Sequence, residues 1–182
     1  KYIYFFSLRN HAIINGFPKT ELIYIHSKLM IIDDRTVLIG SANLNDRSMT
    51  GYRDSEFAVI VQEEQIIQSI MNGQSYLGAN FAISLRKNLM AEHLGISPND
   101  MILNDPVSDI LFLFMIDRAK INTKIYSELF SCYPDDKFTT FTLMKNFGNL
   151  GCGLRNYYFI KDHIIGHIVE FPLHFLEQED LL

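Results

Sequence analysis

The sequence predicts a mixed α/β fold, a layered α-β-α sandwich around a mixed sheet, and two observations support this prediction. The first third alternates β-branched and aromatic runs with turn residues, whereas apolar residues recur at helical spacing further along. Elements of these two kinds bury their apolar faces as packed layers. We therefore expect one lobe over residues 1–182, with a strand-rich part at 1–62 and a helical and C-terminal part at 63–182.

Composition narrows the class of protein before any motif is considered. The 182 residues are 48% hydrophobic and 20% charged, as in a globular protein. The apolar run at residues 110–116 is shorter than the roughly 20 residues that span a bilayer, so a buried helix is favoured over a membrane-inserting element. A net charge of −5 argues against nucleic acid as a partner, and an anionic substrate would be held by a few local cations.

The cysteine content and the first residues bear on localisation. Cys132 and Cys152 form no disulfide framework, which favours a reducing compartment, and we expect a cytoplasmic protein. No secretory signal is visible at the start. The chain begins at Lys1 instead of Met, so we expect it to be a piece of a longer protein.

Strands are expected first. Turn residues at 33–35 separate two strand-like segments, which should therefore pair as a hairpin. A late strand is expected near the C-terminus. The predicted strands are residues 2–6, 21–32, 36–42, 56–61 and 164–171.

Three helices follow the first strands in this prediction. Glu63 and Glu64 suit the start of the first helix, and Gly95 suits the end of the second. Asp105-Pro106 introduces the third helix. The predicted helices are residues 63–73, 76–94 and 109–130, and the predicted loops are residues 97–100, 133–136 and 148–153.

Four polar residues near the predicted hairpin suggest chemistry. On a strand, His26 and Lys28 would leave the same face, and Ser41 and Asn43 repeat that spacing on the other strand. If the turn pairs the strands, an imidazole, an ammonium, a hydroxyl and an amide converge on one patch. Such a set suits a tetrahedral phosphate oxyanion.

The pattern His26-x-Lys28-x4-Asp33-x6-Gly40-Ser41-x-Asn43 resembles the HKD motif of the phospholipase D superfamily. The likeness extends beyond the motif to the C-terminal catalytic half of eukaryotic phosphatidylcholine-specific phospholipases D. Segments that carry it are residues 7–12, 41–49, 53–56, 105–109 and 171–176, and it thins between about 120 and 161.

The resemblance implies a role for each residue of the motif. Two histidines of the family face each other: one attacks the phosphorus and forms a phosphohistidine, and the other protonates the leaving alcohol. His26 matches one of them. Lys28 and Asn43 match the groups that bind the non-bridging oxygens. Ser41 matches a phosphate contact, Glu56 the carboxylate that orients the histidine, and Asp33 a turn and ion-pair residue.

The resemblance also implies partners and an incomplete site. Only one HKD motif is present, so this lobe would be one half of a pseudo-twofold, bilobal enzyme whose N-terminal lobe is absent, or it would pair with a second copy. The implied reaction hydrolyses phosphatidylcholine to phosphatidic acid and choline at a membrane surface, with transfer to alcohols as a side reaction. A small GTPase and phosphoinositides are implied regulators. No cofactor is implied.

Alternatives remain open at this level. The chain could be a self-paired phosphodiesterase or nuclease, or a non-catalytic fragment that binds lipid or a partner. His11 is more simply a structural histidine than a site residue, and Arg86-Lys87 more simply faces solvent than lipid headgroups. His163 and His167 have a spacing that metal pairs use, although their β-like surroundings argue against a metal site.

Overall fold

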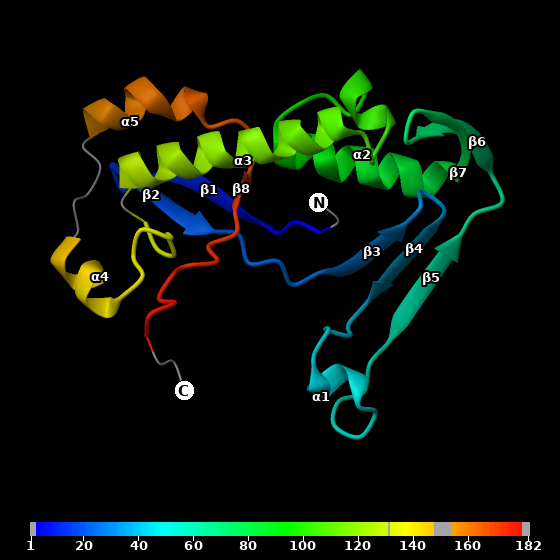
Figure 1. Ribbon diagram of the computed structural model, residues 1–182, viewed down its shortest axis with the longest axis horizontal. Helices are drawn as coiled ribbons and strands as arrows, with labels where there is room; N and C mark the ends of the chain where they lie inside the picture. The colour runs from blue at the N-terminus through cyan, green and yellow to red at the C-terminus, as the bar shows by residue number, and fades with distance from the viewer. Residues whose placement is uncertain (1–2, 131, 148–153, 180–182) are drawn as a thin grey trace. The chain divides into compact units, whose positions relative to one another are not determined.

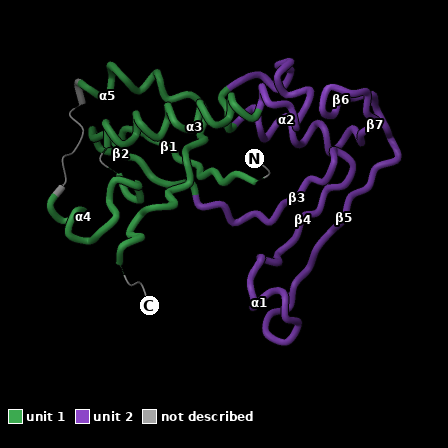
Figure 2. The backbone as a smooth tube through the Cα atoms, viewed as in Figure 1, with its two compact units in different colours: residues 1–23, 93–95, 112–182 green, residues 24–92, 96–111 purple. Residues whose placement is uncertain are grey.

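The computed structural model describes residues 3–130, 132–147 and 154–179, and it confirms the mixed α/β class (Figure 1). In these residues the strands form three antiparallel sheets, with the orders β2-β1-β8, β3-β4-β5 and β6-β7. The backbone divides into two compact units (Figure 2). Unit 1 comprises residues 1–23, 93–95 and 112–182, and unit 2 comprises residues 24–92 and 96–111.

Unit 1 joins a small sheet to helices. Its first two strands form a hairpin whose turn, Asn15-Gly16, has the positive φ angles that such a two-residue turn requires. Its elements are β1 (Phe6–Ile14), β2 (Phe17–Leu22), β8 (Ile168–Glu170), most of α3 (Asp109–Phe130), α4 (Phe141–Phe147), α5 (Leu154–Ile160) and η2 (Lys161–His163).

Two buried polar side chains attach the strands of unit 1 to α3. Asn122 is fully buried, and its amide donates to the carbonyls of Ile165 and Ile168, both at 2.9 Å. Tyr126 is 1% exposed and donates to the Arg9 carbonyl at 3.3 Å. These partners offset the cost of burying polar groups, so α3 and the sheet have a fixed register.

Unit 2 contains the predicted hairpin. Val37 of β4 is fully buried and packs with Ala79 and Ala82, which lie at the junction of a strand and a helix. The elements of unit 2 are β3 (Lys28–Ile32), β4 (Thr36–Gly40), α1 (Asp46–Met49), β5 (Ala58–Gln62), β6 (Ile66–Met71), β7 (Gln74–Ala79), η1 (Met101–Asn104) and most of α2 (Asn80–Leu94).

The register of the β3-β4-β5 sheet positions the motif. Gly40 pairs with Lys28 on one side and with Ala58 on the other. A Cβ atom at Gly40 would lie 2.9 Å from the Ala58 Cβ, so only glycine fits this position. Lys28 is the first residue of β3, Ser41 follows β4, and Glu56 precedes β5 by two residues. The three residues therefore lie at the same end of the sheet.

A buried ion pair anchors the β3-β4 turn. Asp34 is 3% exposed and accepts two hydrogen bonds from Arg86 of α2, from Nε at 2.7 Å and from Nη2 at 2.8 Å. Arg86 also donates to the Leu103 carbonyl at 2.8 Å. The guanidinium is thus buried and not solvent-facing as the sequence suggested. A local pattern could not show this, because Asp34 lies 52 residues away.

Several predicted elements are wrong in type or extent. Residues 63–73 do not form a helix: β6 and β7 pair around Asn72-Gly73, whose positive φ angles suit a tight hairpin turn. Glu63 instead accepts a hydrogen bond from the Phe81 N–H at the start of α2. The second predicted helix starts at Asn80, because residues 76–79 complete β7.

Strand boundaries also moved. The first strand begins at Phe6, where the prediction of 2–6 ends. The predicted long strand at 21–32 is split into β2 and β3 by residues 23–27, and the late strand shortens to Ile168–Glu170. The turn at 33–35, the strand that follows it, the third helix, the end of the second helix at Gly95 and the loops at 97–100 and 133–136 are confirmed. The predicted loop at 148–153 and Cys152 lie outside the described residues.

Candidate functional site

The two basic residues of the motif lie at the start of β3. Lys28 is the first residue of the strand, is partly buried, and donates from Nζ to the His26 carbonyl at 2.6 Å. His26 precedes the strand, so the expectation that both residues lie on one strand is wrong. Its exposed ring stacks on Tyr24, with centroids 6.0 Å apart and planes at 25°. The imidazole is thus open to solvent, and the ammonium of Lys28 is bonded to the backbone of the same residue.

Ser41 and Glu56 are in contact at the open end of the β3-β4 hairpin, opposite its turn. Ser41 follows β4, and its hydroxyl donates to the Glu56 carboxylate. The Phe57 N–H donates back to Ser41 Oγ at 3.0 Å, and the Ser41 N–H donates to the Phe57 carbonyl at 2.9 Å. The backbone hydrogen bond continues the β4-β5 pairing by one residue, and the Phe57 N–H holds the Ser41 hydroxyl beside the carboxylate.

Asn43 lies in the loop between β4 and α1. Its backbone N–H donates to Ser48 Oγ at 3.1 Å, while its exposed side-chain amide makes no hydrogen bond with the described residues. Asn45 caps α1 by accepting the Ser48 N–H at 3.1 Å. The loop therefore holds the Asn43 backbone in place and leaves the amide available to a ligand.

The electrostatics of this edge favour a charged carboxylate. The Ser41 hydroxyl lowers the pKa of Glu56 most, followed by the Ser48 hydroxyl, and the charges of Lys28 and Arg47 lower it further. Burial opposes these effects and raises the pKa by more than the charge of Lys28 or that of Arg47 lowers it. Glu56 thus remains an ionised acceptor at lower pH than an ordinary glutamate.

The structure brings some predicted residues together and not others. Ser41 and Glu56 are in contact, and Lys28 is close enough for its charge to act on Glu56. The expected hydrogen bond from the His26 ring to Glu56 is not formed: within the described chain, the ring of His26 has no hydrogen-bond partner. Which side chains would converge around a phosphate remains a prediction.

The two neighbouring aspartates of the turn have different roles. Asp33 is an exposed turn residue with a φ of 50°, and its carbonyl accepts from the Tyr76 hydroxyl at 2.7 Å. The ion pair expected for Asp33 belongs to Asp34 instead. The motif Asp therefore shapes the turn, and its neighbour ties the turn to α2.

Neither Asp34 nor Ser48 was identified from the sequence. The spacing Asn45-x-x-Ser48 was a usable signal, since an asparagine at the cap accepts the N–H three residues further on. The contact of Ser48 with Asn43 depends on how the loop turns back, and spacing alone does not show that.

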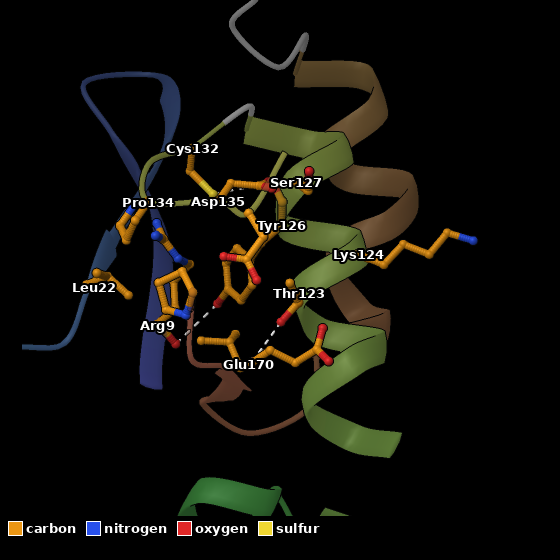
Figure 3. A pocket seen from close by; sticks show the side chains of 13 residues that line it. Arg9, Leu22, Thr123, Lys124, Tyr126, Ser127, Cys132, Pro134, Asp135 and Glu170 are labelled. Atoms are coloured by element: carbon orange, nitrogen blue, oxygen red, sulfur yellow. Dashed lines mark hydrogen bonds between the residues drawn. The ribbon is translucent and has the colours of Figure 1, made fainter. Parts of the chain in front are cut away.

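A cavity of about 280 Å³ lies in unit 1 and contains none of the predicted site residues (Figure 3). Arg9 lines it, donating to the Tyr133 carbonyl at 2.9 Å, and so does Cys132, whose thiol pKa is raised by burial. Nearby, His11 Nδ1 lies 2.9 Å from the Tyr157 hydroxyl, and burial lowers its pKa, as suits a structural histidine.

The described residues were also searched for metal and membrane features. Among them, no group of three or more His, Cys, Asp or Glu side chains is placed to hold a metal ion, and this includes His163 and His167. No helix in the described ranges has the length and apolar character needed to cross a bilayer.

Comparison with known proteins agrees with the motif. The family model described as phospholipase D matches residues 10–130. Phospholipase D2 of Bos taurus is 40% identical over 196 residues, which cover this whole chain and 20% of that protein. Phospholipase D1 of Mus musculus is 44% identical over 188 residues, which cover the whole chain and 17% of that protein.

A relative from a third organism gives the same result. Phospholipase D of Phytophthora infestans is 45% identical over 141 residues, which cover 77% of this chain and 8% of that protein. The chain belongs to the phospholipase D family, and it spans about a fifth or less of the length of these relatives.

Proposed function

We propose that this chain supplies one of the two half-sites of a phospholipase D that hydrolyses phosphatidylcholine to phosphatidic acid and choline. The observation that carries the proposal is the complete HKD pattern at the β3-β4 hairpin of a phospholipase D family member. Residues 1–182 would form the C-terminal lobe of a pseudo-twofold, bilobal enzyme. In that enzyme, residues outside this sequence would complete the α-β-α sandwich.

The reaction would pass through two displacements at phosphorus. In the first, a ring nitrogen of one histidine attacks the phosphorus, and the bond to the choline oxygen breaks as the second histidine gives that oxygen a proton. In the second displacement, the second histidine takes a proton from water, the water oxygen bonds to phosphorus, and the phosphorus–nitrogen bond breaks, which releases phosphatidic acid and the first histidine. A primary alcohol can replace water, which gives the transfer reaction. His26 would be one of these two histidines.

The other motif residues would stabilise the charge that develops on the phosphate. Lys28 and the Asn43 amide would bind the non-bridging oxygens, with Ser41 as a further contact, since positioned donors lower the energy of an oxyanion. Glu56 would orient the His26 ring once the site is complete. Its ionised state and its position beside Ser41 support that role. Asp33 would act through the turn.

The partners follow from the same proposal. They are a phospholipid at a membrane surface and an N-terminal lobe with the second histidine. A small GTPase and phosphoinositides would regulate the enzyme. The protein would be cytoplasmic and peripherally bound to membranes. No nucleic acid is expected, and the net charge of −5 supports this.

The test uses the full-length protein that contains this chain, with phosphatidylcholine vesicles and a primary alcohol present. We expect choline release together with phosphatidyl alcohol, and His26→Asn should lower both at least about 1,000-fold. His163→Asn, at an exposed histidine, is the matched control and should leave both unchanged. Full activity of His26→Asn, or no diester hydrolysis by the wild type, would contradict the proposal.

A self-paired phosphodiesterase is the second candidate, because this chain has a single HKD motif. It predicts a stable twofold dimer of the chain with activity on a generic phosphodiester. Size-exclusion chromatography with an assay of each fraction separates the two. A monomer that gains activity only with the other half of the protein supports the two-lobe enzyme.

A further inference from the structure

We propose that the cavity of unit 1 binds a small tetrahedral oxyanion, a phosphate or a phosphate monoester, through Arg9, Thr123 and Ser127. These three residues line the cavity from two elements, Arg9 from β1 and the two hydroxyl residues from α3 (Figure 3). The cavity contains no residue of the proposed catalytic site, so the inference does not rest on the proposed function.

Arg9 carries a buried positive charge that no carboxylate of the described chain pairs with. The residue is 3% exposed. Its Nη2 donates to the Tyr133 carbonyl at 2.9 Å, and its guanidinium carbon lies 5.8 Å from the centre of the Tyr126 ring, so both partners are neutral. Arg86, which is also buried, instead pairs with Asp34 at 2.7 Å. Since a buried charge is costly without an opposite charge, an anion beside Arg9 is favoured.

Two hydroxyl groups of α3 add donors to the same cavity. Thr123 Oγ1 accepts the Glu170 N–H at 2.8 Å, and Ser127 Oγ accepts from Lys137 Nζ at 2.7 Å. A hydroxyl that accepts a hydrogen bond still has its one hydrogen to donate. Neither of these hydroxyls donates to a residue that the structure describes, so both hydrogens are available to a ligand.

The cavity wall also contains acidic residues, which are Asp135, Asp136 and Glu170. Asp135 forms an ion pair with Lys137 at 3.3 Å, and Asp136 accepts the His174 N–H at 2.8 Å. Lys124 lines the cavity as well, so the cations Arg9, Lys124 and Lys137 equal the acidic groups in number. The charges around the cavity therefore balance, and the hydrogen-bond donors determine the class of ligand.

The number of donors and the size of the cavity favour a phosphate group. One guanidinium serves both oxygens of a planar carboxylate, whereas a phosphate has further oxygens that hydroxyl groups of a second element can reach. The volume of about 280 Å³ is at the lower end for ligand pockets, so the cavity suits a phosphate or its monoester and not a whole lipid. Such a group is present both in soluble phosphate esters and in the headgroup of phosphatidic acid.

The test uses the full-length protein and takes Cys132, which lines the cavity, as a reporter. The protein is labelled with iodoacetamide in phosphate, acetate or chloride at constant ionic strength, and peptide mapping gives the labelling rate of Cys132. We expect phosphate at about ten times its Kd to slow the labelling about tenfold, and acetate and chloride to have little effect. A rate that phosphate leaves unchanged, or acetate as protective as phosphate, would overturn the inference.

Variants connect the protection to the proposed donors. Arg9→Gln should abolish it, and Ser127→Ala should raise the Kd of phosphate about tenfold, while Ser127→Thr keeps the hydroxyl and should restore it. Lys120→Gln removes an exposed cation from the same helix outside the cavity and should match the wild type. Protection that persists in both Arg9→Gln and Ser127→Ala would contradict the assignment. If Arg9→Gln does not fold, the comparison of Ser127→Ala with Ser127→Thr decides.

Two further arms identify the source of the phosphate group and exclude the catalytic site. Vesicles with and without phosphatidic acid are compared with glycerol phosphate: protection by the vesicles assigns a lipid headgroup, protection by glycerol phosphate alone assigns a soluble ester, and either supports the site. His26→Asn should leave the protection of Cys132 by phosphate unchanged, and its loss would place the phosphate at the HKD motif and overturn the inference. A wild type without turnover would refute the phospholipase assignment alone.

Discussion

Two polar groups at opposite ends of the β3-β4 hairpin contrast in their surroundings. At the turn, Asp34 and Arg86 are buried, and their hydrogen bonds are made within unit 2. At the other end, His26, Asn43 and Glu56 are exposed, and the His26 ring and the Asn43 amide are free to meet a ligand. The buried pair has its hydrogen-bond partners within the unit and should stabilise it, whereas the exposed side chains remain accessible to a ligand.

The contrast is sharpest between the adjacent aspartates. Asp33 and Asp34 share a φ of 50°, yet one carboxylate faces solvent and the other is fixed by a guanidinium. Backbone conformation therefore does not separate them, and burial does. Substitutions at the two positions can be compared directly.

The largest effect on stability is expected at Asp34. Asp34→Asn keeps the shape and tolerates the positive φ, but it leaves the buried Arg86 charge without a counterion, which should cost about 3 kcal/mol of the free energy of unfolding. The matched Asp33→Asn should change it by less than about 0.5 kcal/mol. Urea unfolding of both variants measures this, and equal losses would remove the contrast.

The next largest effect is expected in catalysis at Lys28. Lys28→Met removes the ammonium and keeps the stem of the side chain, so kcat/KM should fall about 100-fold, as when one oxyanion donor is removed. Stability should change little, since Lys28 bonds only the neighbouring His26 carbonyl in the described chain. Lys19→Met, which removes an exposed charge from β2, is the control for net charge. A folded, fully active Lys28→Met would contradict the assigned role.

A smaller effect on the pH profile is expected at Ser41. The folded protein lowers the pKa of Glu56, so the ionised form persists as pH falls below the ordinary pKa and is lost only when pH passes through the folded value. Ser41→Ala removes the largest cause of this lowering and should move the acid limb of activity to higher pH. Initial rates over about two pH units on either side of the ordinary glutamate pKa of about 4.3 measure this. A limb that stays in place would show that Glu56 does not control it.

The smallest effect on the free energy of unfolding is expected for the ion pair between Arg47 and Asp54. Arg47 and Asp54 have side chains 63% and 35% exposed, so Arg47→Ala should cost less than about 1 kcal/mol. The difference from the wild type should shrink in high salt, because salt screens exposed charges. Thermal melts at low and high salt test this, and a loss as large as that of Asp34→Asn would contradict the ranking.

Local pattern predicted part of this molecule and long-range contacts decided the rest. The hairpin around residues 33–35 was predictable because turn residues separate two β-branched runs. The helix expected at 63–73 was wrong because Asn72-Gly73, taken as a helix end, is also a strong hairpin turn, and pairing with residues 74–79 favoured the strand. The Asp34–Arg86 pair depends on how α2 packs on the turn, so spacing could not show it.

The candidate site divides in the same way. The motif residues were identifiable by type and spacing, and the contact between Ser41 and Glu56 agrees with their placement at the ends of β4 and β5. His26 lies outside β3 because residues 24–27 belong to no strand in the described chain. The neighbours of His26 in a complete site would include residues of the other half-site, which the motif and the strand register of this chain do not identify.

The central claim is that His26 and a second histidine together catalyse the cleavage of a phosphodiester bond. The most direct measurement is rapid quenching of the full-length protein with phosphorus-labelled phosphatidylcholine, followed by peptide mapping of the labelled histidine. The account predicts label on His26 or on one histidine of the other half-site, and loss of turnover of that label in His26→Asn. Turnover without a histidine adduct, or an adduct that forms and hydrolyses at the wild-type rate in His26→Asn, would contradict it.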